Sequence, residues 1–353
     1  MNRQLAALKR TKVQLTTLAL VGLGLATTTW LPATAVHASG SPNFAIALDP
    51  DSYVVLDPPG SIDTRAHAIT SAGDIVGQYF TADQRSHGFL LTRGVYTTID
   101  PPGSVRTTAA GITCLRSDAE HEDDNERSKG RGDKPYDDWN DPRTCRELAV
   151  VGRFDTADGR AHGFVLAGGT VTQIDFPGAA FTIATSMNAF GHIVGRYQSS
   201  DGAFHGFTLI DGTFTTIDYP GGISIQAMAI NDTGHIAGYY VDAGNRFHGF
   251  LLTDGWFTSF DPPDSVATGS NGSLIGINSR GEIAGRYTTS DGRTHGFLLK
   301  NGRYTTMDIG ERFTCNNGIN RHGLIVGLFE EPNGRRHGFL TSTRALRQEQ
   351  FDF

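Results

Sequence analysis

The sequence predicts an all-β protein, and more specifically a six-bladed β-propeller built from four-stranded blades. Two observations carry this prediction. Three short motifs recur six times in step, and 44 glycines among 353 residues mark frequent turns. Val, Ile, Thr, Tyr and Phe fill the intervals, and no interval keeps the 3.6-residue period of an amphipathic helix. Four-stranded repeats of 42–47 residues are typical of propeller blades rather than of solenoid coils.

The chain begins with a segment that is typical of an export signal. Four basic residues precede an uncharged apolar stretch from Leu15 to Ala26, and small residues stand at Val36 and Ala38, as at a cleavage site. We therefore predict a signal peptide over residues 1–38, cleaved between Ala38 and Ser39, with a retained membrane anchor as the alternative. Residues 39–43 form a short linker, and residues 44–353 form the predicted propeller.

The charge of the chain excludes a general nucleic-acid binder, because such proteins carry a basic footprint. Residues 1–38 contain four basic and no acidic residues, so their removal changes the formal net charge from −7 to −11. We expect a protein that leaves the cytoplasm, does not insert stably into a membrane after cleavage, and is a monomer. The compartment is periplasmic or extracellular.

Each motif occurs once per unit, at matching intervals. The first is His-Gly-Phe, which begins at His87, His162, His205, His248, His295 and His337. The second is a glycine followed two residues later by Tyr or Phe, at Gly77, Gly152, Gly195, Gly238, Gly285 and Gly327. The third is an aspartate that closes a run rich in Thr, Val and Ile, at Asp57, Asp100, Asp175, Asp218, Asp261 and Asp308.

Turn signals divide each unit into four strands. Asn231-Asp232-Thr233-Gly234 separates the first strand from the second, Asp201-Gly202 separates the second from the third, and Asp254-Gly255 separates the third from the fourth. If Asp201-Gly202 is a two-residue turn, Tyr197 lies opposite Gly206. The same nine-residue separation recurs in the other units, so we expect an aromatic ring to cover the glycine of each His-Gly-Phe.

The two ends of the repeat region complement each other. Phe44 to Leu48 and Tyr53 to Asp57 match the third and fourth strands of a unit, whereas the last unit loses the pattern after His337-Gly338-Phe339. We predict that the N-terminal strand completes the last blade, which removes a sheet edge. A seventh blade requires strands from both Phe44–Leu48 and Arg344–Phe353.

The combined pattern resembles the HAF repeats of bacterial extracellular proteins. Its parts are Gly-Ile-Asn-x-x-Gly-x-Ile-(Val/Ala)-Gly-x-Tyr, then Asp-Gly-x-x-His-Gly-Phe-Leu-Leu, then Tyr-Thr-Thr-Ile-Asp-x-Pro-Gly, and it covers nearly all of Phe44 to Leu340. The resemblance implies a secreted or surface repeat protein and brings no established activity. The sequence departs from the pattern at Thr70 and Thr113, which replace the turn Asn, and after Asp308, which precedes Ile-Gly instead of Pro.

The repeated His and Asp residues admit a catalytic or metal-binding interpretation, which we do not favour. On a four-stranded blade, the six His fall on third strands, away from the axis and from each other. We predict that each His forms a hydrogen bond inside its blade, with the repeated Asp as a candidate partner. For the Asp we predict a bond to the backbone of the following turn. No catalytic, cofactor-binding or metal-binding residue is assigned.

The second unit contains an insertion over residues 114–146. Its interior is rich in Asp and Glu, carries a net charge of −4, and has few apolar side chains, which predicts a solvated loop. In an exported protein, Cys114 and Cys145 at its two ends are expected to form a disulfide, with two free thiols as the alternative. Cys315 is expected to be a buried free thiol. Tyr136 and Trp139 are candidate contact residues for a partner.

The function we favour is a non-enzymatic binding or scaffold module in the cell envelope or outside the cell. Its partner would be an extracellular protein or a glycan, and no cofactor is expected. One alternative is a hydrolase or lyase acting at the mouth of the channel, where first-strand ends offer mainly Thr, Ala, Ser and Asn. A second alternative is a carbohydrate-binding protein that uses exposed aromatic residues, for which the candidates are Trp139, Trp256, Phe176 and Tyr219.

Overall fold

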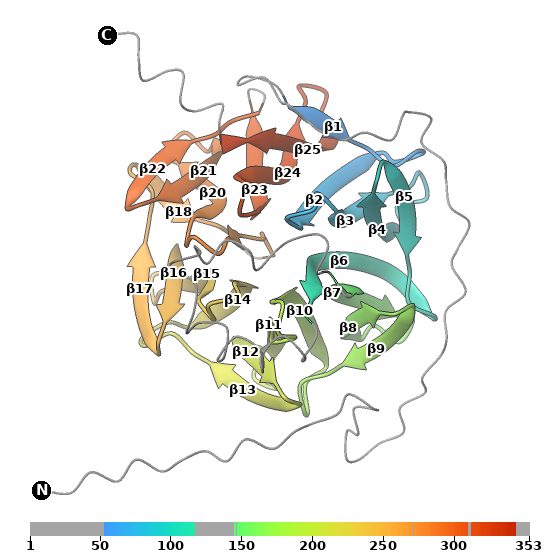
Figure 1. Ribbon diagram of the computed structural model, residues 1–353. Coiled ribbons are helices and arrows are strands. Elements are labelled where there is room, and N and C mark those ends of the chain that lie inside the picture. Colours follow the sequence, from blue (N-terminus) through green and yellow to red (C-terminus); the bar gives the residue numbers. More distant parts are fainter. Residues whose placement is uncertain (1–52, 117–144, 146, 271, 310–311, 344–353) are drawn as a thin grey trace, which may run out of the picture.

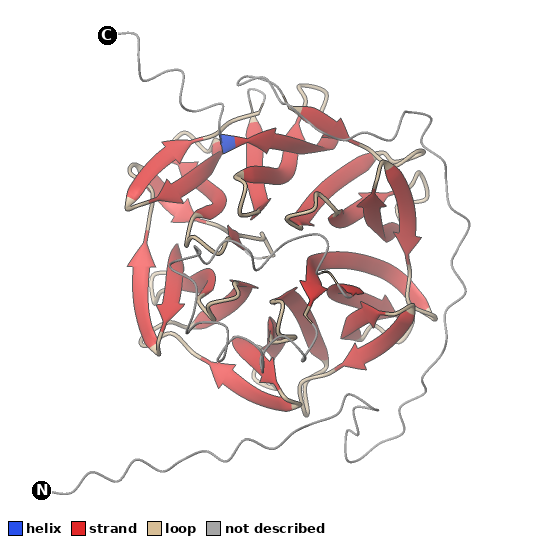
Figure 2. Cartoon of the chain, viewed as in Figure 1, coloured by secondary structure: helices blue, strands red, loops and turns tan. Residues whose placement is uncertain are grey.

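The computed structural model describes residues 53–116, 145, 147–270, 272–309 and 312–343. Within these ranges the chain forms β-strands joined by turns and contains no α-helix (Figure 2). The predictions for residues 1–38, Phe44 to Leu48, Arg344 to Phe353, and for Tyr136 and Trp139, fall outside the described residues.

The strands form antiparallel meanders, each of which we call a unit. Two units stand as separate four-stranded sheets, β2 (Asp63–Ile69), β3 (Ile75–Phe80), β4 (Ser86–Thr92) and β5 (Val95–Ile99), and β14 (Ser224–Ile230), β15 (Ile236–Val241), β16 (Phe247–Thr253) and β17 (Trp256–Phe260). Two further units share one sheet: β6 (Ser104–Leu115), β7 (Glu147–Thr156), β8 (Ala161–Ala167) and β9 (Thr170–Ile174), then β10 (Phe181–Met187), β11 (Ile193–Gln198), β12 (Phe204–Ile210) and β13 (Thr213–Ile217).

The remaining strands also share a sheet. They are β18 (Ser265–Thr268), β19 (Gly276–Ile277), β20 (Ile283–Thr289), β21 (Thr294–Lys300) and β22 (Arg303–Thr306), then β23 (Phe313–Ile319), β24 (Leu324–Glu330) and β25 (Arg336–Ser342). Here β18 and β19 together act as the first strand of a unit, because both pair with β20.

The units stand side by side around a central axis, which is the arrangement of a β-propeller (Figure 1). The first strand of each unit lies nearest the axis and the fourth lies at the rim. Apolar clusters fill the space between neighbouring units. One of them joins Val76 and Ile99 of one unit to Ala109, Phe154 and Phe164 of the next. The core is therefore a series of interfaces around the axis, and the first strands are the ones that lie nearest to that axis.

The N-terminal part of the described chain lies beside its C-terminal part. Strand β1 (Val54–Leu56) pairs antiparallel with β25, with Val54 opposite Leu340 and Leu56 opposite Gly338. Strand β1 therefore serves as the fourth strand of the unit that consists of β23, β24 and β25. Asp57, which follows β1, accepts a hydrogen bond from Nδ1 of His337 at 2.6 Å, so the side chains repeat the contact made by the backbones.

The predicted register of the second and third strands was wrong by one residue. Tyr197 lies opposite His205, and Arg196 lies opposite Gly206. The cause is the turn, which has three loop residues instead of two: the backbone N–H of Ser199 donates to Ala203 O at 3.0 Å, and Gly202 takes a left-handed φ of 89°. The aromatic ring therefore stacks on the histidine, with the centroids of Tyr197 and His205 5.2 Å apart.

A different aromatic residue covers a different glycine. Phe207 of His-Gly-Phe lies opposite Gly195 on the second strand, and the same pair occurs in every unit, as in Gly77 with Phe89. A Cβ added to Gly195 would lie 2.0 Å from Ile183 O and 2.6 Å from the Phe207 ring. Phe207 is fully buried. The first and second motifs are thus the two halves of one packing contact, because only glycine leaves room for the ring and the adjacent backbone.

Gly195→Ala is expected to destabilise the protein by at least about 2 kcal/mol, since neither the Ile183 carbonyl nor the buried ring can move away cheaply. Gly222→Ala is the matched control, because the nearest atoms to its added Cβ lie at 3.4 Å. Urea unfolding of both variants measures the difference. Equal losses at the two positions would show that the ring contact does not constrain the second strand.

Asp57→Ala is expected to destabilise the protein more than Asp218→Ala. Both changes remove a carboxylate that accepts from a histidine, but the Asp57 side chain is 22% exposed and the Asp218 side chain is 59% exposed. We expect losses of about 2 kcal/mol and below about 1 kcal/mol, respectively, from unfolding free energies. The reverse order would contradict a role for Asp57 in holding β1 against β25.

Candidate functional site

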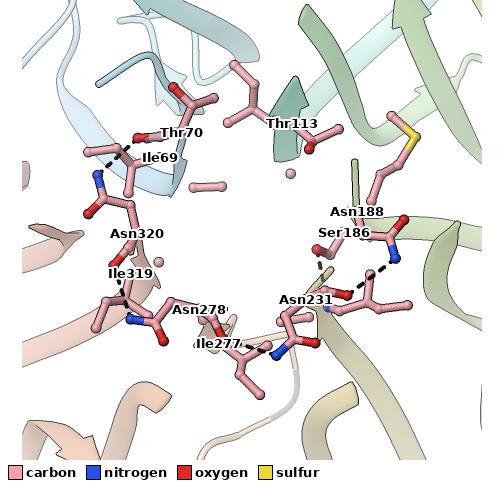
Figure 3. A pocket seen from close by; sticks show the side chains of 18 of the residues that line it. Ile69, Thr70, Thr113, Ser186, Asn188, Asn231, Ile277, Asn278, Ile319 and Asn320 are labelled. Atoms are coloured by element: carbon pink, nitrogen blue, oxygen red, sulfur yellow. Dashed lines mark hydrogen bonds between the residues drawn. The ribbon is translucent and has the colours of Figure 1, made fainter. Parts of the chain in front are cut away.

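A belt of asparagine side chains surrounds one end of the axis (Figure 3). Each follows the first strand of its unit, and its Nδ2 donates to the backbone carbonyl at the same position of the next unit. The bonds run from Asn188 to Asn231 (3.3 Å), from Asn231 to Asn278 (3.0 Å), from Asn278 to Asn320 (3.1 Å) and from Asn320 to Thr70 (3.0 Å). We call these four residues the amide belt.

Each amide also closes the turn in which it stands. Oδ1 of Asn231, for example, accepts from the backbone N–H groups of Thr233 (3.1 Å) and His235 (2.9 Å). Sequence reasoning identified these residues as turn signals and missed their bond to the next unit. The repetition of Asn at 42–47-residue intervals was the available signal.

The amide belt stops at the two positions where the sequence has threonine. The Thr70 hydroxyl bonds Asp74 within its own turn (3.1 Å), and Thr113 lies inside the long hairpin of β6 and β7. That hairpin carries the disulfide between Cys114 and Cys145, whose Cα atoms are 5.4 Å apart. Both cysteines line a cavity of about 170 Å³ at this end of the axis, which we call the amide end. The disulfide between Cys114 and Cys145 therefore lies beside the gap in the belt.

The opposite end of the axis holds a larger cavity of about 410 Å³, which we call the arginine cavity. Five arginines from different units line it: Arg65 on β2, Arg153 on β7, Arg196 on β11, Arg286 on β20 and Arg336 on β25. Three of them occupy the position between the glycine and the aromatic residue of the second motif. Sequence reasoning considered only the first-strand ends at the channel mouth, where it found mainly Thr, Ala, Ser and Asn. It missed this convergence, because the five arginines come from three different strand positions.

Three of these guanidinium groups form ion pairs with carboxylates. Arg65 Nε lies 3.0 Å from Asp63, Arg153 Nε lies 2.6 Å from Asp155, and Arg336 Nε lies 3.0 Å from Glu330. Each pair is built along one unit and is only partly exposed. The carboxylates balance the charges of these three arginines. The net charge of the cavity therefore depends on the other two, Arg196 and Arg286.

Arg196 and Arg286 each donate a hydrogen bond to a neutral side chain. Nη1 of Arg196 donates to Oε1 of Gln226 at 2.5 Å, and the Arg196 residue is only 6% exposed. Burial, and then the nearby Arg153 charge, lower the pKa of Arg196 to about 10, which still leaves it protonated at neutral pH. Arg286 donates to the Ser270 hydroxyl, and its buried Nε has no hydrogen-bond partner within the described ranges.

A loop of the fifth unit connects these two arginines. It replaces the middle of the first strand between β18 and β19, and its Gly269 has a φ of 80° and lies against the buried ring of Tyr239. The Tyr239 hydroxyl donates to Leu274 O at 3.2 Å, which holds the loop in place. Ser270 of the loop bonds Arg286, and the Gly272 N–H donates to Gln226 Oε1 at 3.2 Å.

Phenylalanine rings hold the guanidinium groups in pairs. Arg153 and Arg196 lie 4.7 and 5.6 Å from the centroid of Phe181, and Arg286 and Arg336 lie 5.5 and 5.4 Å from that of Phe313. Such contacts favour a cation over the face of a ring. Each ring therefore has two positively charged groups beside it. Because the rings hold these groups, the arginines are already in position when no ligand is bound.

The two cavities share part of their lining. His67, Thr185, Met228 and Asn317 line both of them. Nδ1 of His67 lies 2.9 Å from Ala109 O, and burial lowers the pKa of this histidine to about 4. His67 is therefore neutral at pH 7 and adds no charge to the arginine cavity.

The six repeated histidines lie on third strands and do not line either cavity. In each, Nδ1 contacts the repeated aspartate, at 2.7 Å for His87 and Asp100, 2.9 Å for His162 and Asp175, 2.7 Å for His205 and Asp218, 2.7 Å for His248 and Asp261, 2.7 Å for His295 and Asp308, and 2.6 Å for His337 and Asp57. The predicted bond from the aspartate to the following turn is replaced by this contact, which fastens the third strand to the end of the fourth.

Some of these contacts, at Ser199 and also at Thr81 and Thr289, have the order of a hydroxyl nucleophile, a base and an orienting acid. Oγ of Ser199 lies 3.1 Å from Nε2 of His205, whose Nδ1 contacts Asp218. The Ser199 hydroxyl, however, donates to Asp201 in its own turn. The same position is Asp242 in the next unit, 3.2 Å from His248 Nε2. A position that accepts either Ser or Asp ties the turn to the histidine and does not depend on a nucleophile.

The aromatic residues proposed for carbohydrate binding differ in their surroundings. Trp256 on β17 is 79% exposed. Phe176 stacks on Tyr197 and Tyr219 stacks on Tyr240, each with centroids 3.6 Å apart, so one face of each ring is already covered. Trp256 is thus the one of these three that presents most of its surface to solvent.

Three further findings concern the free cysteine, metal binding and membrane-spanning helices. Cys315 on β23 is a buried free cysteine, as predicted. Across the ranges that the structure describes, no group of three or more His, Cys, Asp or Glu side chains is placed to hold a metal ion. In the same ranges, no helix has the length and apolar character needed to cross a bilayer.

No protein-family model matches the sequence, and no curated protein is significantly similar to it. Among solved structures, a puromycin-hydrolyzing peptidase of Mycobacterium tuberculosis is 13% identical, with a TM-score of 0.47 over 85% of this chain, and the chain spans 56% of the length of that peptidase. A fucose-recognising lectin of Aleuria aurantia with a six-bladed β-propeller fold is 11% identical, with a TM-score of 0.47 over 80% of this chain and 93% of the lectin. The β-propeller domain of the Trilobed protease from Pyrococcus furiosus is 10% identical, with a TM-score of 0.42 over 79% of this chain and 95% of that domain. Similarity at this level carries no conclusion about a ligand or an activity.

His248 is expected to make stability depend on pH. Burial disfavours its charged form, but hydrogen bonds to Asp261 and Asp242 outweigh this cost, so its pKa is raised above the usual 6.5. The stabilisation by the charged imidazolium is fully present below the unfolded pKa and is lost as pH rises through the folded pKa. The loss of unfolding free energy in His248→Gln should therefore be larger at about pH 5.5 than at about pH 8.5. If the loss of unfolding free energy were the same at both pH values, the charged imidazolium of His248 would not contribute to stability.

Proposed function

We propose that this chain is a secreted, non-enzymatic β-propeller that binds an extracellular ligand in the arginine cavity. The observation that carries the proposal is the convergence of five guanidinium groups from separate units on one axial cavity of about 410 Å³. Ligand sites in proteins are concave and contain a few polar groups whose positions are fixed beforehand. The repeated histidines and aspartates, in contrast, are occupied with bonds inside their own units.

The proposed architecture has six blades, with β1 as the outer strand of the last. The antiparallel pairing of β1 with β25 and the contact between Asp57 and His337 support it. A single closed ring would bring the five cavity arginines, which come from different units, around one axis, as the site requires. A seventh blade would need strands from the segments outside the described residues.

Export is proposed from three features. They are the N-terminal signal, with cleavage between Ala38 and Ser39, the resemblance to the HAF repeats, and the disulfide between Cys114 and Cys145, a bond that persists in oxidising compartments. The exported protein acts as a monomer in the periplasm or outside the cell. Its partner is an extracellular small molecule, glycan or protein that presents a group of suitable size to the cavity.

Carbohydrate binding is the second candidate. Trp256 favours it, because an exposed indole on an outer strand is a suitable platform for the apolar face of a sugar ring. This surface lies at the rim, on β17, whereas the arginine cavity lies at the axis. The two candidate sites can therefore be separated by substitution.

A channel-filling variant tests the proposal. Thr108→Trp places a large ring on the wall of the arginine cavity, and Thr258→Trp, on the exposed face of β17, is the control. A library of metabolites and glycans is screened by thermal shift against the mature chain. Ligands should stabilise the wild type and Thr258→Trp equally and lose their effect with Thr108→Trp, and mass spectrometry should recover them unchanged.

Two results would contradict the proposal. Ligands that stabilise Thr108→Trp as strongly as the wild type bind outside the arginine cavity, and Trp256→Ala then tests the rim. Ligands that are recovered chemically converted would make the protein an enzyme. Circular dichroism of Thr108→Trp establishes that the variant is folded before binding is compared.

A further inference from the structure

We propose that the arginine cavity binds a small oxyanion, that is, the carboxylate, phosphate or sulfate group of a compact molecule, at Arg196 and Arg286. This inference rests on the function proposed above and specifies its ligand class. It is argued from the charge of the cavity, the placement of the donors, and the residues at the same position of other units.

The charge of the cavity is positive. Asp63, Asp155 and Glu330 balance Arg65, Arg153 and Arg336, and no carboxylate forms an ion pair with Arg286 within the described ranges. The other titratable groups on the wall do not add negative charge. His67 is neutral at pH 7, and burial raises the pKa of the Cys315 thiol, so this cysteine is also uncharged. An anion is the ligand that such a wall attracts.

The two arginines are held in place for a shared ligand. Arg196 extends from β11 to the loop between β18 and β19. A Cβ added to Gly272 of this loop would lie 3.7 Å from Nη2 of Arg196. Arg286 bonds Ser270 of the same loop. Both guanidinium groups also lie against phenylalanine rings, Phe181 and Phe204 for Arg196 and Phe313 for Arg286. Planar donors fixed in this way match the oxygen atoms of an oxyanion.

Arg286 keeps an unused donor. Its Nε is buried and has no hydrogen-bond partner among the described residues. A buried donor that forms no hydrogen bond is costly, and native structures seldom leave one without a reason. An oxyanion oxygen beside Arg286 would offer this donor an acceptor, and its negative charge would compensate that of the guanidinium group.

The fold does not require arginine at these positions. Arg153, Arg196 and Arg286 lie between the glycine and the aromatic residue of the second motif, and the corresponding residues of the other units are Gln78, Tyr239 and Leu328. Gln78 stands on β3 with the same pairing as its arginine counterparts, opposite the glycine of His-Gly-Phe. The blade therefore accepts neutral side chains here, which separates the arginines from the requirements of folding.

Calorimetric titration tests the inference. Inorganic phosphate, sulfate, citrate and glucuronate are each titrated into the full mature chain at constant ionic strength, with glucose as the neutral probe. We expect at least one oxyanion to bind one-to-one and glucose not to bind. Arg196→Gln and Arg286→Gln should each weaken that binding at least about tenfold, the loss typical of one charge-assisted hydrogen bond.

Matched variants separate the cavity from general charge. Arg160→Gln removes the same charge from the exposed turn between β7 and β8 and should change the affinity by less than about twofold. Arg286→Lys keeps the charge and should bind more tightly than Arg286→Gln. Thermal melts compare the folded state of all variants, and Gln is chosen because Gln78 occupies the equivalent position.

The results that would overturn the inference are specific. If none of the four oxyanions binds saturably, or if Arg160→Gln weakens binding as much as the cavity variants do, the oxyanion site does not exist. A neutral ligand whose effect is abolished by Thr108→Trp would keep the proposed binding function and eliminate only the oxyanion. Ligands insensitive to Thr108→Trp would eliminate both.

Discussion

The close approach of a phenylalanine ring to a strand glycine is the constraint on which the other features of this fold depend. In each unit the ring of the third strand occupies the space that a side chain on the second strand would fill, as Phe207 does at Gly195. The carbonyl of the first strand approaches the same glycine from the other side, at Ile183. Three strands are thereby held at one register, and the ring becomes part of the interface with the next unit.

This register determines what faces the axis. Side chains alternate between the two faces of a strand, so the residue beside the glycine points away from the ring. At Arg153, Arg196 and Arg286 that residue lines the arginine cavity. At the opposite end, the amide belt links the first strands through bonds from side chain to backbone, and it stops where the disulfide-closed hairpin enters. The first strands are thus linked by neutral amide side chains at one end of the axis, and positively charged arginine side chains line the cavity at the other end.

Much of the fold could be predicted from the sequence, because repetition reveals which residues share an environment. The all-β class, the four strands per unit and the location of β1 follow from motif spacing. The register did not, since Asp201-Gly202 is compatible with a two-residue or a three-residue loop and one residue exchanges the faces. The arginine cavity was missed for a different reason: Arg65, Arg196 and Arg336 occupy unlike positions in their units, and only the ring brings them together. The asparagines were recognised as turn residues, but a bond to the next unit is not visible within a single repeat.

The most direct test of the account is to locate an anion in crystals of the mature protein. Selenate has the shape and charge of sulfate and can be located by its anomalous scattering. The account predicts an anomalous peak in the arginine cavity, within hydrogen-bonding distance of Arg196 and Arg286, and its loss in crystals of the Arg286→Gln variant. Peaks confined to exposed arginines on the outer surface, with an empty cavity in the wild type, would contradict it.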